Sequence, residues 1–120
     1  MNDTINANLL LHFNEPGSSQ VLKSFSEYTL AIMTAEIPCH AIAKDTVLLL
    51  NLDKPGRAFI VHEVVVDLTE GQTTINLTPT YAFLADIKKE EGKLLSPSKA
   101  WVEKFCDKCE ENGWDFSWEP

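Results

Sequence analysis

The stretch from Thr46 to Pro79 constrains the fold of this chain more than any other. It holds three apolar runs, Thr46–Leu52, Arg57–Leu68 and Thr73–Pro79, in which Val, Ile, Leu and Thr dominate. The two segments between the runs contain the Pro and Gly residues that tight turns favour. Such spacing is typical of antiparallel strands joined by hairpins, so we predict a three-strand meander over about residues 46–79.

The middle run of this stretch is expected to be a central strand. The segment Lys54–Arg57 before it suits a type II turn, because Pro55 takes the second place and Gly56 supplies the positive φ of the third. Apolar residues then occupy part of both alternating faces, which predicts cover on both sides of the strand for at least part of its length. His62 falls within one of these apolar rows, so we interpret it as a hydrogen-bonded core residue rather than a catalytic base.

The residues before the meander allow two interpretations. Ala7–Phe13 is predicted to be a first strand, ended by the Pro and Gly that follow. For the next segment we favour a helix over Ser19–Ile32, because apolar residues recur at three- and four-residue spacing. The rival interpretation is a strand over Glu27–Ile37, where larger and smaller residues alternate. Ile37–His40 should be extended, because the residue before proline avoids helical angles.

Two helices are expected after the meander. The first opens at Thr78 and Pro79, continues to about Glu91, and stops at Gly92. On it, Tyr81, Leu84, Ala85 and Lys88 are predicted to share a side.

The second helix shows the clearest pattern in the chain. Ser96 is expected to cap it, Pro97 to occupy its first turn, and Gly113 to end it. Its apolar stripe comprises Val102, Phe105, Cys106 and Cys109.

The C-terminal segment Trp114–Pro120 alternates aromatic and polar residues, which predicts a short strand. One interpretation is that its aromatic side chains hold the chain end against the sheet. The other is that part of the segment stays exposed and binds a partner, with carboxylates steering a basic surface towards aromatic anchors. We assign the candidate partner-binding residues on this second interpretation; they are Trp114, Asp115, Phe116, Trp118 and Glu119.

Size and composition fit one folded domain over residues 1–120. Hydrophobic residues make up 44% of the chain and charged residues 23%, as in ordinary globular proteins. We therefore predict a single α+β domain with a mainly antiparallel sheet of about four to six strands, built on the meander at about 46–79. Two or three helices are expected to pack on this sheet.

The formal net charge is −8, from 18 acidic and 10 basic residues. Such a charge opposes contact with phosphate backbones, so we expect no direct nucleic-acid binding. One interpretation is that this charge favours encounter with a basic protein. The other is that it only keeps the protein soluble.

We expect a cytoplasmic protein without a membrane segment. The apolar run near the N-terminus, Leu9–Leu11, is too short for a signal peptide core, and no run approaches the ~20 apolar residues that span a bilayer. Three cysteines are an odd number, which favours reduced thiols over a secreted disulfide framework.

Cysteine and histidine residues give no convincing metal or redox site. Cys106 and Cys109 have the C-x-x-C spacing of zinc ligands, and the adjacent residues Cys39 and His40 would have to complete a set of four ligands. However, adjacent strand residues point to opposite faces, and both thiols of the first pair lie on the predicted apolar stripe. We expect core cysteines, no metal, no cofactor and no catalytic residues, since nucleophile elbows and phosphate loops are also missing from the sequence.

The leading hypothesis is a small acidic, non-enzymatic binding protein that engages a more basic macromolecule. Immunity proteins, antitoxins and phage-type inhibitors have this size and charge. The alternatives are a small-ligand or metal-binding module that uses Cys and His residues, and a homo-oligomeric structural protein, such as a homodimer joined through an edge strand.

Overall fold

The computed structural model describes residues 3–16, 28–39, 43–91 and 98–118, and within these ranges it contains six strands and two helices. The strands are β1 (Thr4–His12), β2 (Tyr28–Pro38), β3 (Val47–Leu50), β4 (Arg57–Asp67), β5 (Gln72–Pro79) and β6 (Asp115–Trp118). The helices are α1 (Tyr81–Glu91) and α2 (Lys99–Glu111). None of the described helices is long and apolar enough to span a membrane.

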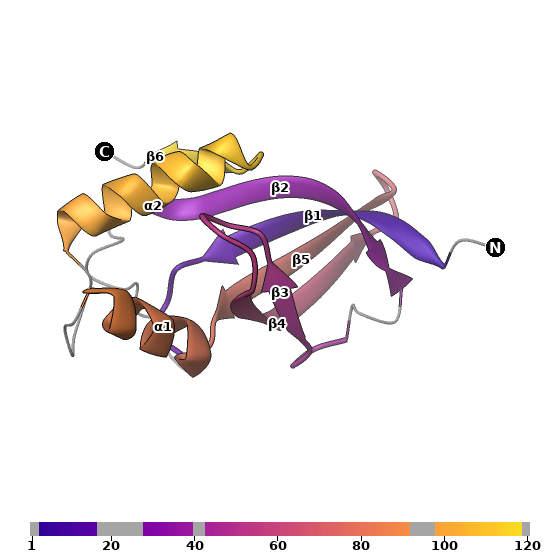
Figure 1. Cartoon of the computed structure of the whole chain (residues 1–120). Helices are drawn as coiled ribbons and strands as arrows, with labels where there is room; N and C mark the ends of the chain where they lie inside the picture. Colours follow the sequence, from indigo (N-terminus) through magenta and orange to yellow (C-terminus); the bar gives the residue numbers. More distant parts are fainter. Residues whose placement is uncertain (1–2, 17–27, 40–42, 92–97, 119–120) are drawn as a thin grey trace.

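The strands form one mixed sheet in the order β3-β4-β5-β1-β2-β6, curled into a half-barrel (Figure 1). Strands β1 and β5 are parallel, with Leu9 beside Ile75 and Leu11 beside Leu77. The other four neighbouring pairs are antiparallel. The protein is therefore an α+β structure with an antiparallel-rich sheet.

The predicted fold class is wrong. The sheet is not built on a three-strand meander at residues 46–79, because the strands of that stretch make up only half of a six-stranded mixed sheet. Strand β1, from the other end of the chain, lies in parallel beside β5 and places β2 and β6 beyond it. This pairing joins residues far apart in the sequence, which local apolar spacing does not specify.

The helix predicted over Ser19–Ile32 is wrong where the structure describes it. Residues 28–32 belong to β2, which pairs with β1 from Leu30 onward; residues 19–27 lie outside the described residues. Ala31 is fully buried opposite Leu11. This segment is therefore a strand, because its long-range pairing with β1 outweighs the local spacing that favours a helix.

A β-bulge in β4 explains why both faces of this strand look apolar in the sequence. Val61 pairs with Leu77 and Glu63 with Asn76, so His62 is the additional residue between them. Phe59 and Val61 are buried before the bulge, whereas His62 and Glu63 are exposed at it. The prediction that His62 lies in the core is therefore wrong. At the start of β4 both faces are covered, since the adjacent residues Ala58 and Phe59 are both buried.

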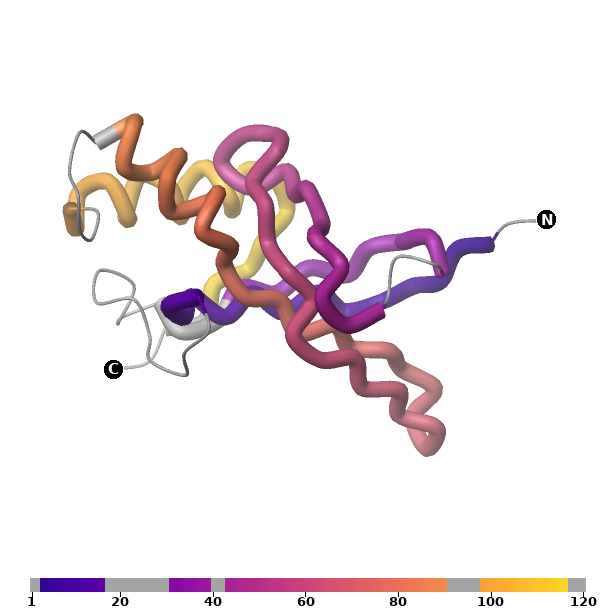
Figure 2. Tube along the Cα trace, turned by 90° about the horizontal axis from the view of Figure 1, so that it is seen from below, coloured from indigo at the N-terminus to yellow at the C-terminus, as the bar shows by residue number. Residues whose placement is uncertain are grey.

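The hydrophobic core lies between the inner face of the sheet and the two helices, which lie at one end of the molecule (Figures 1 and 2). Alternate β1 residues from Ala7 to Leu11 contribute to it, as does Phe13 just after the strand, with Ile75 and Leu77 beside β1. The β4–β5 hairpin extends away from this body (Figure 2), and Leu68 at its end is 90% exposed. The sheet therefore has a covered end, where side chains from several elements meet, and an open end.

Helix α1 begins later than predicted. Pro79 is the last residue of β5, paired with Phe59, and the Thr80 hydroxyl accepts a hydrogen bond from the Phe83 amide at 3.1 Å, as an N-cap does. Phe83 and Ile87 are buried, and Tyr81 is 75% exposed. Tyr81, Leu84, Ala85 and Lys88 share a side of α1 by their spacing, and the side buried in the core is that of Phe83 and Ile87.

Helix α2 is confirmed, with a different start. Ser98 is its N-cap and accepts a hydrogen bond from the Trp101 amide; Ser96 and Pro97 lie outside the described residues. Gly113 has φ +95° and its amide donates to the Glu110 carbonyl, while the Trp114 amide donates to that of Cys109. These two bonds form a Schellman ending, which directs the chain into β6.

Candidate functional site

Arg57 joins three elements beneath α2 and organises the covered end of the sheet. It is the first residue of β4, and its side chain is fully buried. Its Nε and one Nη donate to the two carboxylate oxygens of Asp53, both at 2.7 Å, and its two Nη groups donate to Glu90 at 3.0 and 3.1 Å. Asp53 lies in the loop between β3 and β4 and Glu90 lies in α1, so one guanidinium connects the loop to the helix.

Three aromatic rings surround this guanidinium. Its carbon lies 5.7 Å from the ring centre of Phe83 and 6.0 Å from those of Trp101 and Phe105, within the range of cation–π contact. Burial alone would lower the pKa of Arg57, but hydrogen bonds to the carboxylates of Asp53 and Glu90 outweigh burial and raise it. Arg57 is therefore a permanent structural cation whose donors are already engaged.

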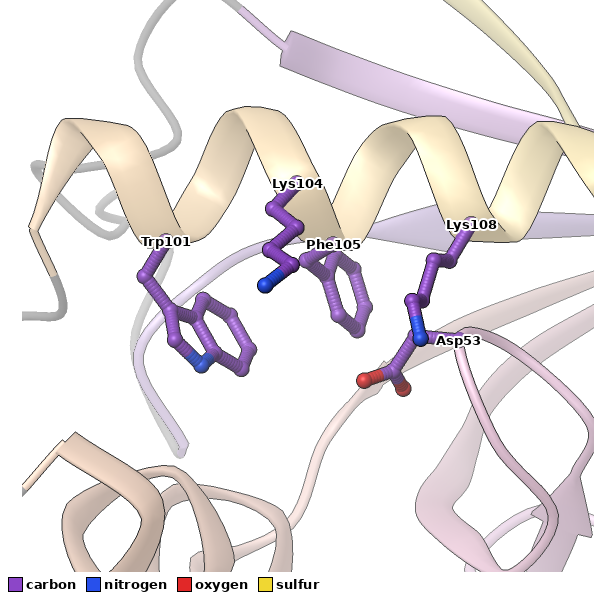
Figure 3. A pocket seen from close by; sticks show the side chains of 5 residues that line it. All are labelled: Asp53, Trp101, Lys104, Phe105 and Lys108. Atoms are coloured by element: carbon purple, nitrogen blue, oxygen red, sulfur yellow. The ribbon is translucent and has the colours of Figure 1, made fainter.

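A cavity of about 190 Å³ opens beside this network (Figure 3). Trp101, Lys104, Phe105 and Lys108 line it from α2, and Asp53 faces them from the loop after β3. The four α2 residues follow helical spacing, so they form one flank of the helix. The indole of Trp101 stacks on the buried ring of Phe105 with 5.0 Å between centres.

The outer side of α2 next to this flank is acidic. Its exposed carboxylates follow the same helical spacing and are those of Glu103, Asp107, Glu110 and Glu111. Asp115, the first residue of β6, is also exposed. We call Glu103, Asp107, Glu110 and Glu111 the acidic flank. Lys104 and Lys108 border this flank, since Asp107 and Glu111 each follow one of them by three residues on the helix.

The structure places the predicted partner-binding residues in different environments. The strand predicted for the C-terminal segment is confirmed as β6, which pairs with β2 at the edge of the sheet. Trp114 and Phe116 are 2% and 9% exposed and belong to the core, whereas Asp115 is exposed. Trp118 lies in β6, and Glu119 lies outside the described residues. Partner binding by this segment stays a prediction, with Asp115 as its accessible member.

The described cysteines are free. Cys106 and Cys109 are buried on the inner side of α2, as predicted, and Cys39 is exposed after β2. Burial, together with the nearby Glu110 and Asp107, raises the pKa of Cys106 to about 12. Burial also raises the pKa of Cys109, so both thiols stay neutral at physiological pH.

The outer face of the sheet holds a polar chain that crosses three strands. The Nε2 of His12 donates to Asn76 Oδ1 at 2.7 Å, and the Asn76 amide donates to Glu63 at 3.5 Å. His40 lies outside the described residues. Among the described residues there is no group of three or more His, Cys, Asp or Glu that could hold a metal ion.

Sequence reasoning missed the Arg57 network and the cavity. One signal was available, because Arg57 is the only arginine of the chain and follows Asp53 by four residues across a tight turn. The contribution of Glu90 was not visible, since it lies 33 residues away in the sequence. The helical spacing of the charged residues of α2 is visible in the sequence, although the prediction of this helix depends on its apolar stripe alone.

Comparison of the chain with models of protein families, with curated proteins and with solved structures finds no match.

Proposed function

We propose that this chain is a small, non-enzymatic binding protein that acts in the cytoplasm and engages a macromolecule with a more basic surface. The observation that carries the proposal is the acidic flank of α2, whose four exposed carboxylates follow one side of a helix. Clustered charge of one sign speeds encounter with an oppositely charged surface and selects against acidic partners, including nucleic acids. The proposal covers three classes of protein: immunity proteins, antitoxins and phage-type inhibitors of nucleic-acid enzymes.

The way α2 is held supports its use as a binding element. Its inner stripe is buried, its start is capped by Ser98, and its end is fixed by the Schellman hydrogen bonds of Gly113 and Trp114. A preorganised helix loses little conformational entropy when a partner binds. The neutral, buried thiols of Cys106 and Cys109 fit a structural role better than nucleophilic catalysis, and free thiols fit a reducing compartment.

Affinity capture with two matched double variants tests this proposal. Glu103→Gln/Asp107→Asn neutralises part of the acidic flank, whereas Glu15→Gln/Glu70→Gln neutralises two exposed acids elsewhere, so both variants have the same net charge. We expect the wild type and the control variant to retain a basic protein from native cell extract, and salt to elute it. The flank variant should retain about tenfold less of this protein. Equal retention by the two variants would contradict the proposal.

Self-association through β3 is a second candidate. This strand is an edge of the sheet, and Val47 and Leu49 on it are 51% and 72% exposed. Exposed apolar edge strands pair readily with another strand. A homodimer in light scattering that Leu49→Lys converts to monomer is the expected result; a wild-type monomer at all concentrations would exclude this candidate.

A further inference from the structure

We infer that the cavity beside α2 is a binding site for a small aromatic anion, a planar ring that carries a carboxylate or a phosphate. This site is separate from the acidic flank and goes beyond the proposed function. It combines two features that together select such a ligand. One is an aromatic wall formed by Trp101 and Phe105, and the other is a pair of lysines, Lys104 and Lys108, beside that wall.

The aromatic wall is prepared for stacking. Phe105 is buried and supports the Trp101 indole at an interplanar angle of 17°, while Trp101 itself remains half-buried at the cavity. Offset stacking of a further ring on such a pair is favourable beyond the area that it buries. A cavity of roughly 150 Å³ accommodates benzene, so about 190 Å³ is sufficient for one substituted ring.

The two lysines supply the positive charge. Lys104 and Lys108 project from α2 on the cavity side (Figure 3), and they make no hydrogen bond or ion pair with any residue that the structure describes. Ammonium groups one helical turn apart can approach the same anionic group.

The carboxylate of Asp53 does not oppose this assignment. Both of its oxygens accept hydrogen bonds from Arg57, and Glu90 is likewise engaged by Arg57 and by Lys54 at 2.9 Å. Arg57 and Lys54 contribute two positive charges and Asp53 and Glu90 two negative charges, so this network is neutral. Among the residues that line the cavity, Lys104 and Lys108 are therefore the charged side chains that this network does not engage. A cationic ligand would meet these lysines, and the lining carboxylate of Asp53 is already bound by Arg57.

The same network makes the cavity rigid. Arg57 fixes the loop that carries Asp53 against α1, and its cation–π contacts fix the loop against Trp101 and Phe105 of α2. The walls of the cavity are thus positioned before any ligand arrives, which lowers the entropic cost of binding.

Titration of the full-length ¹⁵N-labelled protein with benzoate and with phenyl phosphate tests the inference. Benzyl alcohol and cyclohexanecarboxylate serve as the uncharged and the non-aromatic controls. The readout is the indole N–H resonance of Trp101, identified with Trp101→Phe. We expect one or both anions to shift this resonance with a millimolar or tighter Kd, and both controls to bind several-fold more weakly.

Two double variants make the test specific. Lys104→Gln/Lys108→Gln should weaken binding of the aromatic anion about tenfold. Lys44→Gln/Lys88→Gln removes the same charge at exposed positions outside the cavity and should leave the Kd unchanged. The inference is overturned if neither anion shifts Trp101 at about 10 mM, if benzyl alcohol binds equally well, or if the two double variants behave alike. None of these outcomes depends on the acidic flank, so the proposed function stands or fails independently.

Discussion

The indole Nε1 of Trp114 donates a hydrogen bond to the backbone carbonyl of Asn51 at 2.9 Å, across 63 residues of sequence. The side-chain amide of Asn112 donates to the neighbouring carbonyl of Leu52 at 2.6 Å. The end of α2 is therefore fastened to the loop that also carries Asp53. This connection orients both flanks of the helix, since the loop is in turn held by Arg57.

Substitution of Trp114 tests whether the C-terminal aromatic residues are part of the core. Trp114→Ala should lower the free energy of unfolding by about 3 to 5 kcal/mol, because it removes a fully packed indole. Trp114→Phe should cost about 1 kcal/mol, mainly through the lost hydrogen bond. Urea denaturation provides both values. A Trp114→Ala variant as stable as wild type would show that this side chain is not held as described.

Arg57→Met should destabilise the protein by about 3 kcal/mol, because it leaves Asp53 and Glu90 close together without their shared cation. The triple variant Asp53→Asn/Arg57→Met/Glu90→Gln removes all three charges and should recover part of that loss. Thermal and urea denaturation measure the difference. A triple variant less stable than Arg57→Met would contradict the charge argument.

Glu90 predicts a specific pH dependence. Burial tends to raise its pKa, but hydrogen bonds from Arg57 and Lys54 outweigh burial and lower the pKa below the usual 4.5. The stabilisation is therefore complete above that value and disappears as the pH falls through the lower pKa of the folded state. Glu90→Gln should be less stable than wild type at pH 7 and should lose less stability on acidification. Parallel acid-denaturation profiles for the two proteins would contradict this account.

Thiol reactivity separates the exposed cysteine from the buried pair. Cys39 should react rapidly with a thiol-specific disulfide reagent at pH 8, whereas Cys106 and Cys109 should react only as the protein unfolds. In denaturant all three thiols should react. In the native protein, we expect the colour of the released reagent to level off after one equivalent of thiol has reacted. Fast reaction of Cys106 in the native protein would show that α2 is not packed through that side.

The sequence predicts some elements well because their signals are local. The spacing of Val102, Phe105 and Cys109 defines the inner side of α2, and Gly113 defines its end, since few other residues adopt positive φ readily. The alternation after Gly113 likewise predicts β6.

The remaining features depend on contacts between distant segments. Parallel pairing of β1 with β5 has no local signal, and it gives the sheet its mixed character. The bulge at His62 shifts the alternation of β4, so the sequence looks apolar on both faces. A charged residue beside a turn is ordinarily exposed, and only the approach of Glu90 and three aromatic rings makes burial of Arg57 favourable. The cavity could not be predicted for the same reason.

The most direct test of the proposed function is photo-crosslinking in the native cells. A photoreactive amino acid in place of Asp107 reports contacts of the acidic flank, and the same group in place of Glu70 reports those of an exposed acidic position in the turn between β4 and β5. The proposal predicts a discrete adduct with a basic protein from position 107 and none from position 70. Adducts of equal yield from both positions, or no adduct from position 107, would contradict it.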